Sequence, residues 1–443
     1  MKAVSRVFPI VKIEKNETRR RIASTEKENI MSNIKDINLA PSGADKIAWV
    51  QSYMPILNTV RAEFERTQPF KGMKIAMSIH LEAKTAYLAK VLRAGGAEVH
   101  VTGCNPLSTQ DDVAAALAAE GFDVNARHGV SDEEYTEHLK ATLSCCPDLI
   151  IDDGGDLISL LHGECRDYGK NLIGGCEETT TGIHRLLSRE KAGLLDYTMI
   201  DVNDADCKHL FDNRYGTGQS TLDGIMNSTN LILAGKTLVV AGYGWCGKGV
   251  AMRAKGMGCV VVVTEIDPIK AIEAVMDGFT VLPMDEAAKV GDLFITLTGC
   301  CDVIRREHFE VMKDGILLAN SGHFDVEIDK KALKALSVED WERKPNIHGY
   351  RMKDGRVLNL LAEGRLVNLA AGNGHPAEIM DMSFGIQAKG LEYLAKHGKE
   401  MDNRVYAVPA EIDRAVALIK LNANNVHIDT LSPEQEAYLN KVE

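Results

Sequence analysis

The feature that most constrains this fold is Gly-Tyr-Gly-Trp-Cys-Gly-Lys-Gly at residues 242–249. An apolar run at 238–241 precedes it, a helical pattern follows Gly247, and a second apolar run covers 260–263. A Gly-x-Gly-x-x-Gly turn between strand and helix lets the backbone approach a pyrophosphate at the helix N-terminus. We therefore predict a βαβ unit that binds a dinucleotide.

An acid after the second predicted strand indicates which dinucleotide is bound. Glu265 lies 23 residues after Gly242 (265 − 242), where a carboxylate accepts hydrogen bonds from a ribose 2′-hydroxyl. A carboxylate there repels a 2′-phosphate, so NAD is favoured over NADP. Lys248 is not a P-loop lysine, because Val250 follows Gly249 and the P-loop spacing does not match.

Alternating strand and helix patterns extend over most of the chain. Residues 73–80 and 97–103 are typical of strands, and residues 82–96 between them have helical spacing. The pattern resumes with strands at 292–299 and 315–323. We predict an α/β fold of two doubly wound parallel-sheet domains, each sheet covered by helices on both faces.

The composition of the connecting segments predicts the domain limits. We expect chain crossings near 211–224 and 370–376, so that an NAD-binding Rossmann domain is inserted into a discontinuous substrate domain. The polar N-terminus is expected to be a disordered extension or a start-site artefact, with Met31 as an alternative start. The expected parts are an extension at 1–34, a substrate domain at 35–216 and 377–408, an NAD domain at 217–376, and an oligomer-contacting tail at 409–443 with a short helix capped by Ser432.

Charge and cysteine content exclude several classes of partner. The net charge of −12 disfavours nucleic acid and anionic membranes, and no apolar run approaches the ~18 residues of a membrane span. The ten cysteines form no Cys-x-x-Cys pair of the zinc type, so we expect free thiols in a reducing cytoplasm.

Polar residues gather just after the predicted strands, where open α/β sheets bind ligands. Taken singly, each has a structural explanation as a helix cap, a turn residue or a solvated group. Together they predict a site: an Asp beside a Lys can poise a hydroxyl for deprotonation, and histidines can transfer protons. The stretches are His80, Asp152–Asp156, Glu177–Thr181, Lys208–Asn213, His323 and His375.

A zinc site is the alternative interpretation of the same residues. His80, Asp153, His323 and His375 are all possible ligands. They lie far apart in the sequence, and no His-x-x-x-His or His-x-Glu spacing links them. We therefore expect no metal.

Seven motifs in order resemble the S-adenosyl-L-homocysteine hydrolase family over about residues 35–440. The chain is most similar to its short archaeal and thermophile branch, which includes S-inosyl-L-homocysteine hydrolase. The motifs are DDGGDL, EETTTG, FDNRYG, VVAGYG, TEIDP, GHFDVEID and LLAEGRLVNL.

The resemblance implies a redox cycle whose net result is hydrolysis of a nucleosyl-homocysteine. Bound NAD oxidises the ribose 3′-hydroxyl, the resulting ketone acidifies the C4′ proton, homocysteine leaves, water adds at C5′, and the ketone is reduced again. It also implies a homotetramer and a place in recycling after S-adenosylmethionine-dependent methylation. Dehydrogenase chemistry with net redox and a non-catalytic NAD sensor remain alternatives.

The resemblance also assigns roles residue by residue. Lys208 and Asp212 match the pair that handles the 3′-hydroxyl, Asp153 the acid near the C4′ proton, and His80 and His323 the histidines near C5′. Glu178 matches the ribose-binding acid and His375 a histidine that closes over the base. The expected NAD contacts are Thr179, Thr180, Thr181, Asn213, Gly242, Gly244, Trp245, Cys246, Gly247, Lys248, Gly249, Glu265, Ser321, Gly322, His323 and Asn368.

Two departures from longer family members affect these expectations. Glu82 and Lys84 replace a Thr and a Glu or Gln that reads the base. Lysine only donates hydrogen bonds, so Lys84 suits a 6-oxo base such as hypoxanthine, unless it pairs with Glu82 or faces solvent. The C-terminus, which ends YLNKVE, lacks a Lys- and Tyr-containing segment, so we expect weaker NAD retention and a less secured tetramer.

Overall fold

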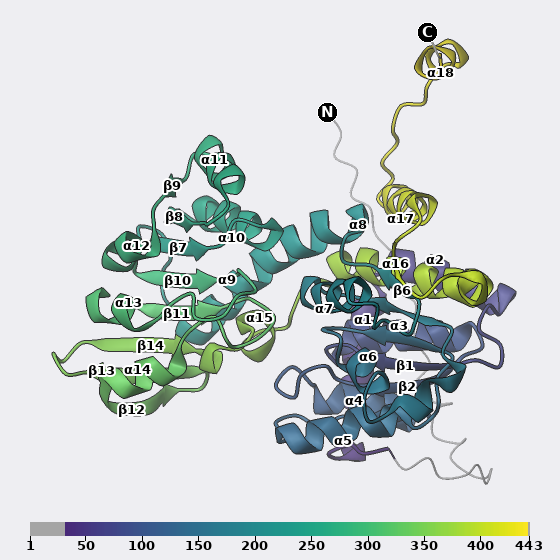
Figure 1. The fold of residues 1–443 in the computed structure, drawn as a ribbon, viewed down its shortest axis with the longest axis horizontal. Helices are drawn as coiled ribbons and strands as arrows, with labels where there is room; N and C mark the ends of the chain where they lie inside the picture. Colours follow the sequence, from purple (N-terminus) through teal and green to yellow (C-terminus); the bar gives the residue numbers. More distant parts are fainter. Residues whose placement is uncertain (1–31, 442–443) are drawn as a thin grey trace, which may run out of the picture. The chain divides into compact units, whose positions relative to one another are not determined.

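The computed structural model describes residues 32–441, and its strands form two separate sheets (Figure 1). Most of the predicted extension therefore lies outside the described residues. The first sheet is entirely parallel, in the order β15-β6-β5-β4-β1-β2-β3. Its strands are β1 (Lys74–Ser78), β2 (Glu98–Thr102), β3 (Asp123–Asn125), β4 (Leu149–Asp152), β5 (Gly174–Glu177), β6 (Met199–Asp201) and β15 (Val405–Ala407).

Alternating residues of these strands enter two different hydrophobic cores. In β1, Ile75 and Met77 pack into one core and Ala76 into the other. Burial on both faces explains why a central strand such as β4, Leu-Ile-Ile-Asp, is mostly apolar. The helices on the first face are α1 (Ala40–Gln51), α2 (Pro55–Thr67), α3 (Ala83–Ala94), α4 (Asp111–Ala119) and α16 (Ala377–His397), and those on the second are α5 (Asp132–Leu143), α6 (Asp156–Leu161) and α7 (Thr180–Lys191).

The second sheet has the order β12-β13-β14-β11-β10-β7-β8-β9. Its helices again form two cores, with α9 (Thr217–Thr229), α10 (Trp245–Gly256) and α11 (Pro268–Met276) in one and α12 (Met284–Val290), α13 (Arg306–Val311) and α14 (Lys330–Leu336) in the other. The α/β prediction of two doubly wound sheets is confirmed. The strands are β7 (Thr237–Ala241), β8 (Val260–Thr264), β9 (Thr280–Val281), β10 (Leu293–Thr296), β11 (Leu317–Asn320), β12 (Ser337–Lys344), β13 (Ile347–Met352) and β14 (Val357–Leu361).

One edge of this sheet differs from the all-parallel expectation. The pairs β12–β13 and β13–β14 are antiparallel. Only residues 345–346 join β12 to β13, and a two-residue connection cannot cross over to make a parallel pair. Asn346 takes the positive φ of 66° that this tight turn requires.

The crossing near residue 211 is helical. Short α8 (Asp206–Lys208) leads into a π-helix, His209–Gly216, and then into α9. Gly218 of α9 faces the Gly249 backbone so closely that a Cβ would lie 2.7 Å from the Gly249 carbonyl. The domain limits themselves stay a prediction.

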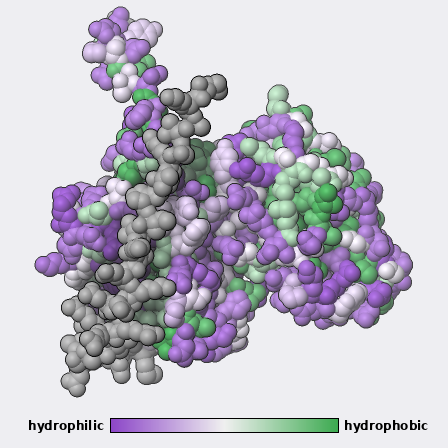
Figure 2. Space-filling view, turned by 180° about the vertical axis from the view of Figure 1, so that it is seen from behind, coloured by the Kyte–Doolittle hydropathy of each residue, from purple (hydrophilic) through white to green (hydrophobic). Residues whose placement is uncertain are grey.

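The C-terminal segment contains two helices with different surroundings. α17 (Ala410–Ala423) contacts α2, α8 and α16 and buries Val416 in the first core. α18 (Pro433–Leu439) buries no residue, and Ser432 caps it as predicted. No helix among residues 32–441 has both the length and the apolarity to cross a membrane. On the face shown in Figure 2, hydrophilic residues predominate.

We expect Asp381 of α16 to be a major source of stability. Its fully buried carboxylate accepts hydrogen bonds from the backbone nitrogens of Ile56 and Leu57, each at 2.9 Å, and so caps α2 from another helix. Asp381→Ala should lower the free energy of unfolding by about 2 kcal/mol, measured by urea denaturation. Asp381→Asn, which keeps one acceptor, should lose less. An unchanged urea midpoint for Asp381→Ala would contradict this role.

Candidate active site

A cavity of about 1840 Å³ collects residues from the carboxyl ends of strands in both sheets. Every residue to which the sequence analysis assigned a catalytic or binding role lines it except Gly247, Lys248 and Gly249; of the wider stretches, Asp152 and Glu177 do not line it. A Cβ at Gly247 would lie 1.9 Å from the Gly242 carbonyl oxygen, and one at Gly249 1.7 Å from that of Arg214. Lys248 pairs with Glu273 at 2.6 Å instead of facing the cavity. In this structure Gly247 therefore packs against the turn, Gly249 against Arg214, and Lys248 against α11.

The turn has the features that NAD requires. Gly242 has a φ of 102°, and a Cβ at Gly244 would meet nothing within 4 Å, so the backbone there is open to a ligand. No side chain of residues 32–441 caps the N-terminus of α10, so its first N–H groups can bind a pyrophosphate. The Glu265 carboxylate accepts hydrogen bonds from the backbone nitrogens of Tyr243 and Ile266, each at 2.7 Å, and still lines the cavity. The chain's residues therefore fit the dinucleotide.

Lys208 lies at the centre of a buried network of polar side chains. Its Nζ is 3.5 Å from Glu178 Oε1 and 3.6 Å from Asp212 Oδ2, and it donates to Asn213 Oδ1 at 2.9 Å. The side chain of Lys208 is only 6% exposed. The π-helix and the short α8 before it place Lys208, Asp212 and Asn213 on one side of the cavity.

The charges of this network are set by their neighbours. Burial disfavours the Lys208 ammonium, but Asp212 and Glu178 outweigh burial and raise the pKa of Lys208 above its ordinary value. Burial would raise the pKa of Asp212, yet Lys208 and His375 hold it well below the usual range. Burial raises the pKa of Glu178 despite the opposing effect of Lys208.

Helix α16 holds two of these carboxylates through residues that the sequence analysis missed. Ser383 donates to Asp212 Oδ2 at 2.7 Å, and Gln387 donates to Glu178 Oε2 at 2.6 Å. Both side chains are fully buried. The sequence signal that could have revealed them is that Ser383 and Gln387 are polar and lie four residues apart on an otherwise apolar face of a helix.

His375 contacts this network rather than standing apart from it. Its Nδ1 is 2.7 Å from Asp212 Oδ1, and its Nε2 is 3.3 Å from Thr217 Oγ1. His375 also lines the cavity, and its role over a base stays a prediction.

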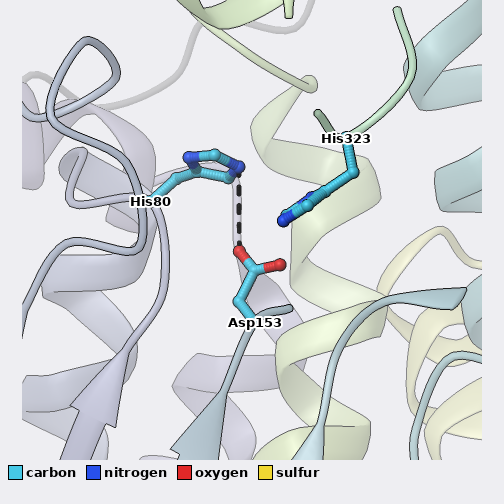
Figure 3. Close-up of side chains that lie close together, drawn as sticks. All are labelled: His80, Asp153 and His323. Atoms are coloured by element: carbon cyan, nitrogen blue, oxygen red, sulfur yellow. Dashed lines mark ion pairs between the residues drawn. The ribbon is translucent and has the colours of Figure 1, made fainter. Parts of the chain in front are cut away.

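His80, Asp153 and His323 converge in the cavity (Figure 3). Their nearest ligand atoms all lie within 4.8 Å of one another, and His80 Nε2 is 3.8 Å from Asp153 Oδ2. A Cβ at Gly154 would lie 2.7 Å from His323 Nε2, so glycine allows the imidazole to approach the Asp153 loop. Long sequence separation was thus a poor argument against the zinc alternative, although His375 lies elsewhere. The absence of a metal stays a prediction.

The hydrogen bonds around His80 favour one tautomer. Ser108 Oγ lies 2.6 Å from His80 Nδ1 and also donates to the Asn105 carbonyl at 3.0 Å. Since a hydroxyl has one proton, Ser108 accepts from a protonated Nδ1, which leaves a lone pair on Nε2 facing Asp153. Burial lowers the pKa of His80 to about 4, and the carboxylate of Asp153 opposes this only partly.

Lys84 is buried and paired. Its Nζ lies 2.9 Å from Glu82 Oε2 and donates to the Asn373 carbonyl at 3.0 Å. The pairing with Glu82 that the sequence left open is therefore present, and Lys84 still lines the cavity.

Comparisons with known proteins agree with this geometry. Residues 31–174 match the family model of S-adenosyl-L-homocysteine hydrolase, and residues 213–374 match the NAD binding domain of the same family. The adenosylhomocysteinases of Pyrococcus abyssi and Aquifex aeolicus are both 56% identical, over 92% and 93% of this chain and 96% and 99% of their own. The S-inosyl-L-homocysteine hydrolase of Methanopyrus kandleri is 55% identical over 92% of this chain and 96% of its own.

The fold and the cavity define an NAD-binding α/β enzyme of two Rossmann-like sheets. The chain belongs to the S-adenosyl-L-homocysteine hydrolase family, as the resemblance of its motifs predicted.

We expect His80 to remain neutral and Nδ1-protonated throughout the physiological range. Because burial lowers its pKa to about 4, protonation should begin only as the pH falls below about 5. Imidazole ¹⁵N shifts of histidine-labelled protein between pH 8 and pH 4.5 measure this directly, and Ser108→Ala should disturb the tautomer. Titration of His80 near pH 6.5 would contradict the assignment.

Proposed function

We propose that the protein catalyses the reversible, NAD-dependent hydrolysis of an S-nucleosyl-L-homocysteine to L-homocysteine and the nucleoside. The observation that carries this proposal is the buried Lys208, held between Glu178 and Asp212 in the cavity that the glycine turn also lines. A redox reaction at a sugar hydroxyl needs such a group beside the oxygen that loses its proton.

The network would act on the ribose 3′-hydroxyl. Lys208 carries a positive charge and can stabilise the negative charge that develops on the 3′ oxygen. Asp212 stays ionised and holds Lys208 in place. Glu178, whose Oε1 accepts no hydrogen bond among residues 32–441, can accept one from a ribose hydroxyl.

The second cluster would act at the neighbouring carbons. Asp153 has a buried oxygen, Oδ1, with no partner in the described part of the chain, and it can accept the C4′ proton. His80 presents a lone pair at Nε2 and can exchange a proton with water or the departing sulfur at C5′. His323 reaches the same place from the loop after β11.

The residues of the second sheet would hold the cofactor. When bound, NAD supplies a reversible hydride acceptor, so that no net oxidation results. Glu265 would bind the adenosine ribose, and the open backbone at Gly244 the pyrophosphate. Asn368 is buried, its Oδ1 has no partner among the described residues, and it can accept from a carboxamide N–H. Thr179–Thr181, Trp245, Cys246 and Ser321–His323 would complete the contacts.

We also propose a homo-oligomer in a reducing compartment, consistent with the cytoplasm. All ten cysteines are free thiols, as expected where disulfides do not persist. The tail exposes Ile428, Leu431, Tyr438 and Leu439, which a second copy of the chain could cover.

The test of the function is release of homocysteine from S-adenosyl- and S-inosylhomocysteine by the NAD-loaded enzyme. Lys208→Ala should lower kcat about 100-fold or more, because the 3′ oxygen loses its stabilising charge. Lys389→Ala is the matched control: Lys389 also pairs with two carboxylates, Glu63 and Glu392, but lies outside the cavity. Accumulation of free NADH in proportion to product would indicate a dehydrogenase instead.

We propose that Lys84 favours a 6-oxo base. Although Lys84 pairs with Glu82, this pairing and the hydrogen bond to the Asn373 carbonyl use two of its three ammonium hydrogens, so the third can still donate to a base in the cavity. The enzyme should have an about tenfold higher kcat/KM for the inosyl than for the adenosyl substrate, and Lys84→Gln should reduce this ratio. An adenosyl preference that Lys84→Gln leaves unchanged would disprove this specificity.

A further inference from the structure

Cys104 approaches Asp153 from the loop that follows β2. Its Sγ lies 3.1 Å from Asp153 Oδ2, and the residue is 8% exposed. Burial raises the pKa of the Cys104 thiol well above its ordinary range, and Asp153 adds to this effect. The thiol therefore stays protonated and donates a hydrogen bond to the carboxylate.

No other side-chain donor holds this carboxylate within residues 32–441. His80 presents a lone pair, not a proton, to Oδ2, at a distance of 3.8 Å. Asp153 Oδ1 accepts no hydrogen bond, and Figure 3 shows it directed toward His323. The thiol thus occupies one oxygen and leaves the other directed toward His323.

The position of Cys104 is itself fixed by α5. Tyr135 Oη lies 2.9 Å from both the Cys104 carbonyl oxygen and Asp156 Oδ2. Asp156 is three residues beyond Asp153, at the start of α6. Tyr135 therefore ties the loop that carries the thiol to the loop that carries the carboxylate.

We propose that Cys104 is a positioning residue that holds the Asp153 carboxylate so that Oδ1 faces the C4′ hydrogen. This inference rests on the proposed function, in which Asp153 accepts that proton. Without this hydrogen bond, the carboxylate of Asp153 is free to rotate. The free energy of a hydrogen bond to a charged group corresponds to about a tenfold change in rate.

The experiment compares four variants by steady-state kinetics and by deuterium exchange at C4′ of the nucleoside in D₂O. Cys104→Ala and Cys104→Val remove the donor, and valine also fills the space. Cys104→Ser keeps a donor. Cys165→Ala removes a thiol that is also buried but is not the donor to Asp153.

Both variants without a donor should exchange the C4′ hydrogen about tenfold more slowly and lose kcat similarly, with KM within about threefold of the wild type. Cys104→Ser should restore exchange to within about threefold, and Cys165→Ala should leave it unchanged. Wild-type exchange in Cys104→Val, or exchange in Cys104→Ser as slow as in Cys104→Val, would overturn the inference. A wild-type enzyme that cleaves neither substrate would instead overturn the proposed function, and this inference with it.

Discussion

The site depends on one ammonium group buried among carboxylates. Lys208 is 6% exposed, and an uncompensated charge at that depth would be strongly destabilising. Asp212 and Glu178 compensate it, and Ser383 and Gln387 fix both carboxylates from α16. Helix α16, near the C-terminus, therefore holds two carboxylates that lie some 170 to 210 residues earlier in the sequence.

The same helix links stability to the site. Asp381 caps α2, while Ser383 and Gln387, further along α16, reach the carboxylates. A buried helix with polar side chains needs a partner for each of them, since an unpaired polar group in the core is destabilising. In α16 these partners are the N-terminus of α2 and the carboxylates around Lys208. The same helix therefore contributes both to the stability of the fold and to the geometry of the site.

Much of the fold followed from patterns in the sequence. Continuous apolar runs ending in glycine or acids predicted the parallel strands, and the β7–α10–β8 unit was predicted from its glycines and Glu265. The antiparallel edge at β12–β13 was missed, because an alternation of strand and helix segments along the chain does not specify the direction in which each strand runs. The packing roles of Gly247 and Gly249 were also missed, since they depend on the backbone that each glycine faces.

The sequence by itself determined the fold class and the family, and all but three of the residues to which it assigned a catalytic or binding role line the cavity, because motifs and strand ends are local features. Only the tertiary structure decided how those side chains pair. It placed His375 on Asp212, Lys84 on Glu82, and Cys104 behind Asp153. The His375–Asp212 and Cys104–Asp153 contacts join residues far apart in the sequence, and a hydrogen bond forms only where folding brings donor and acceptor within about 3 Å.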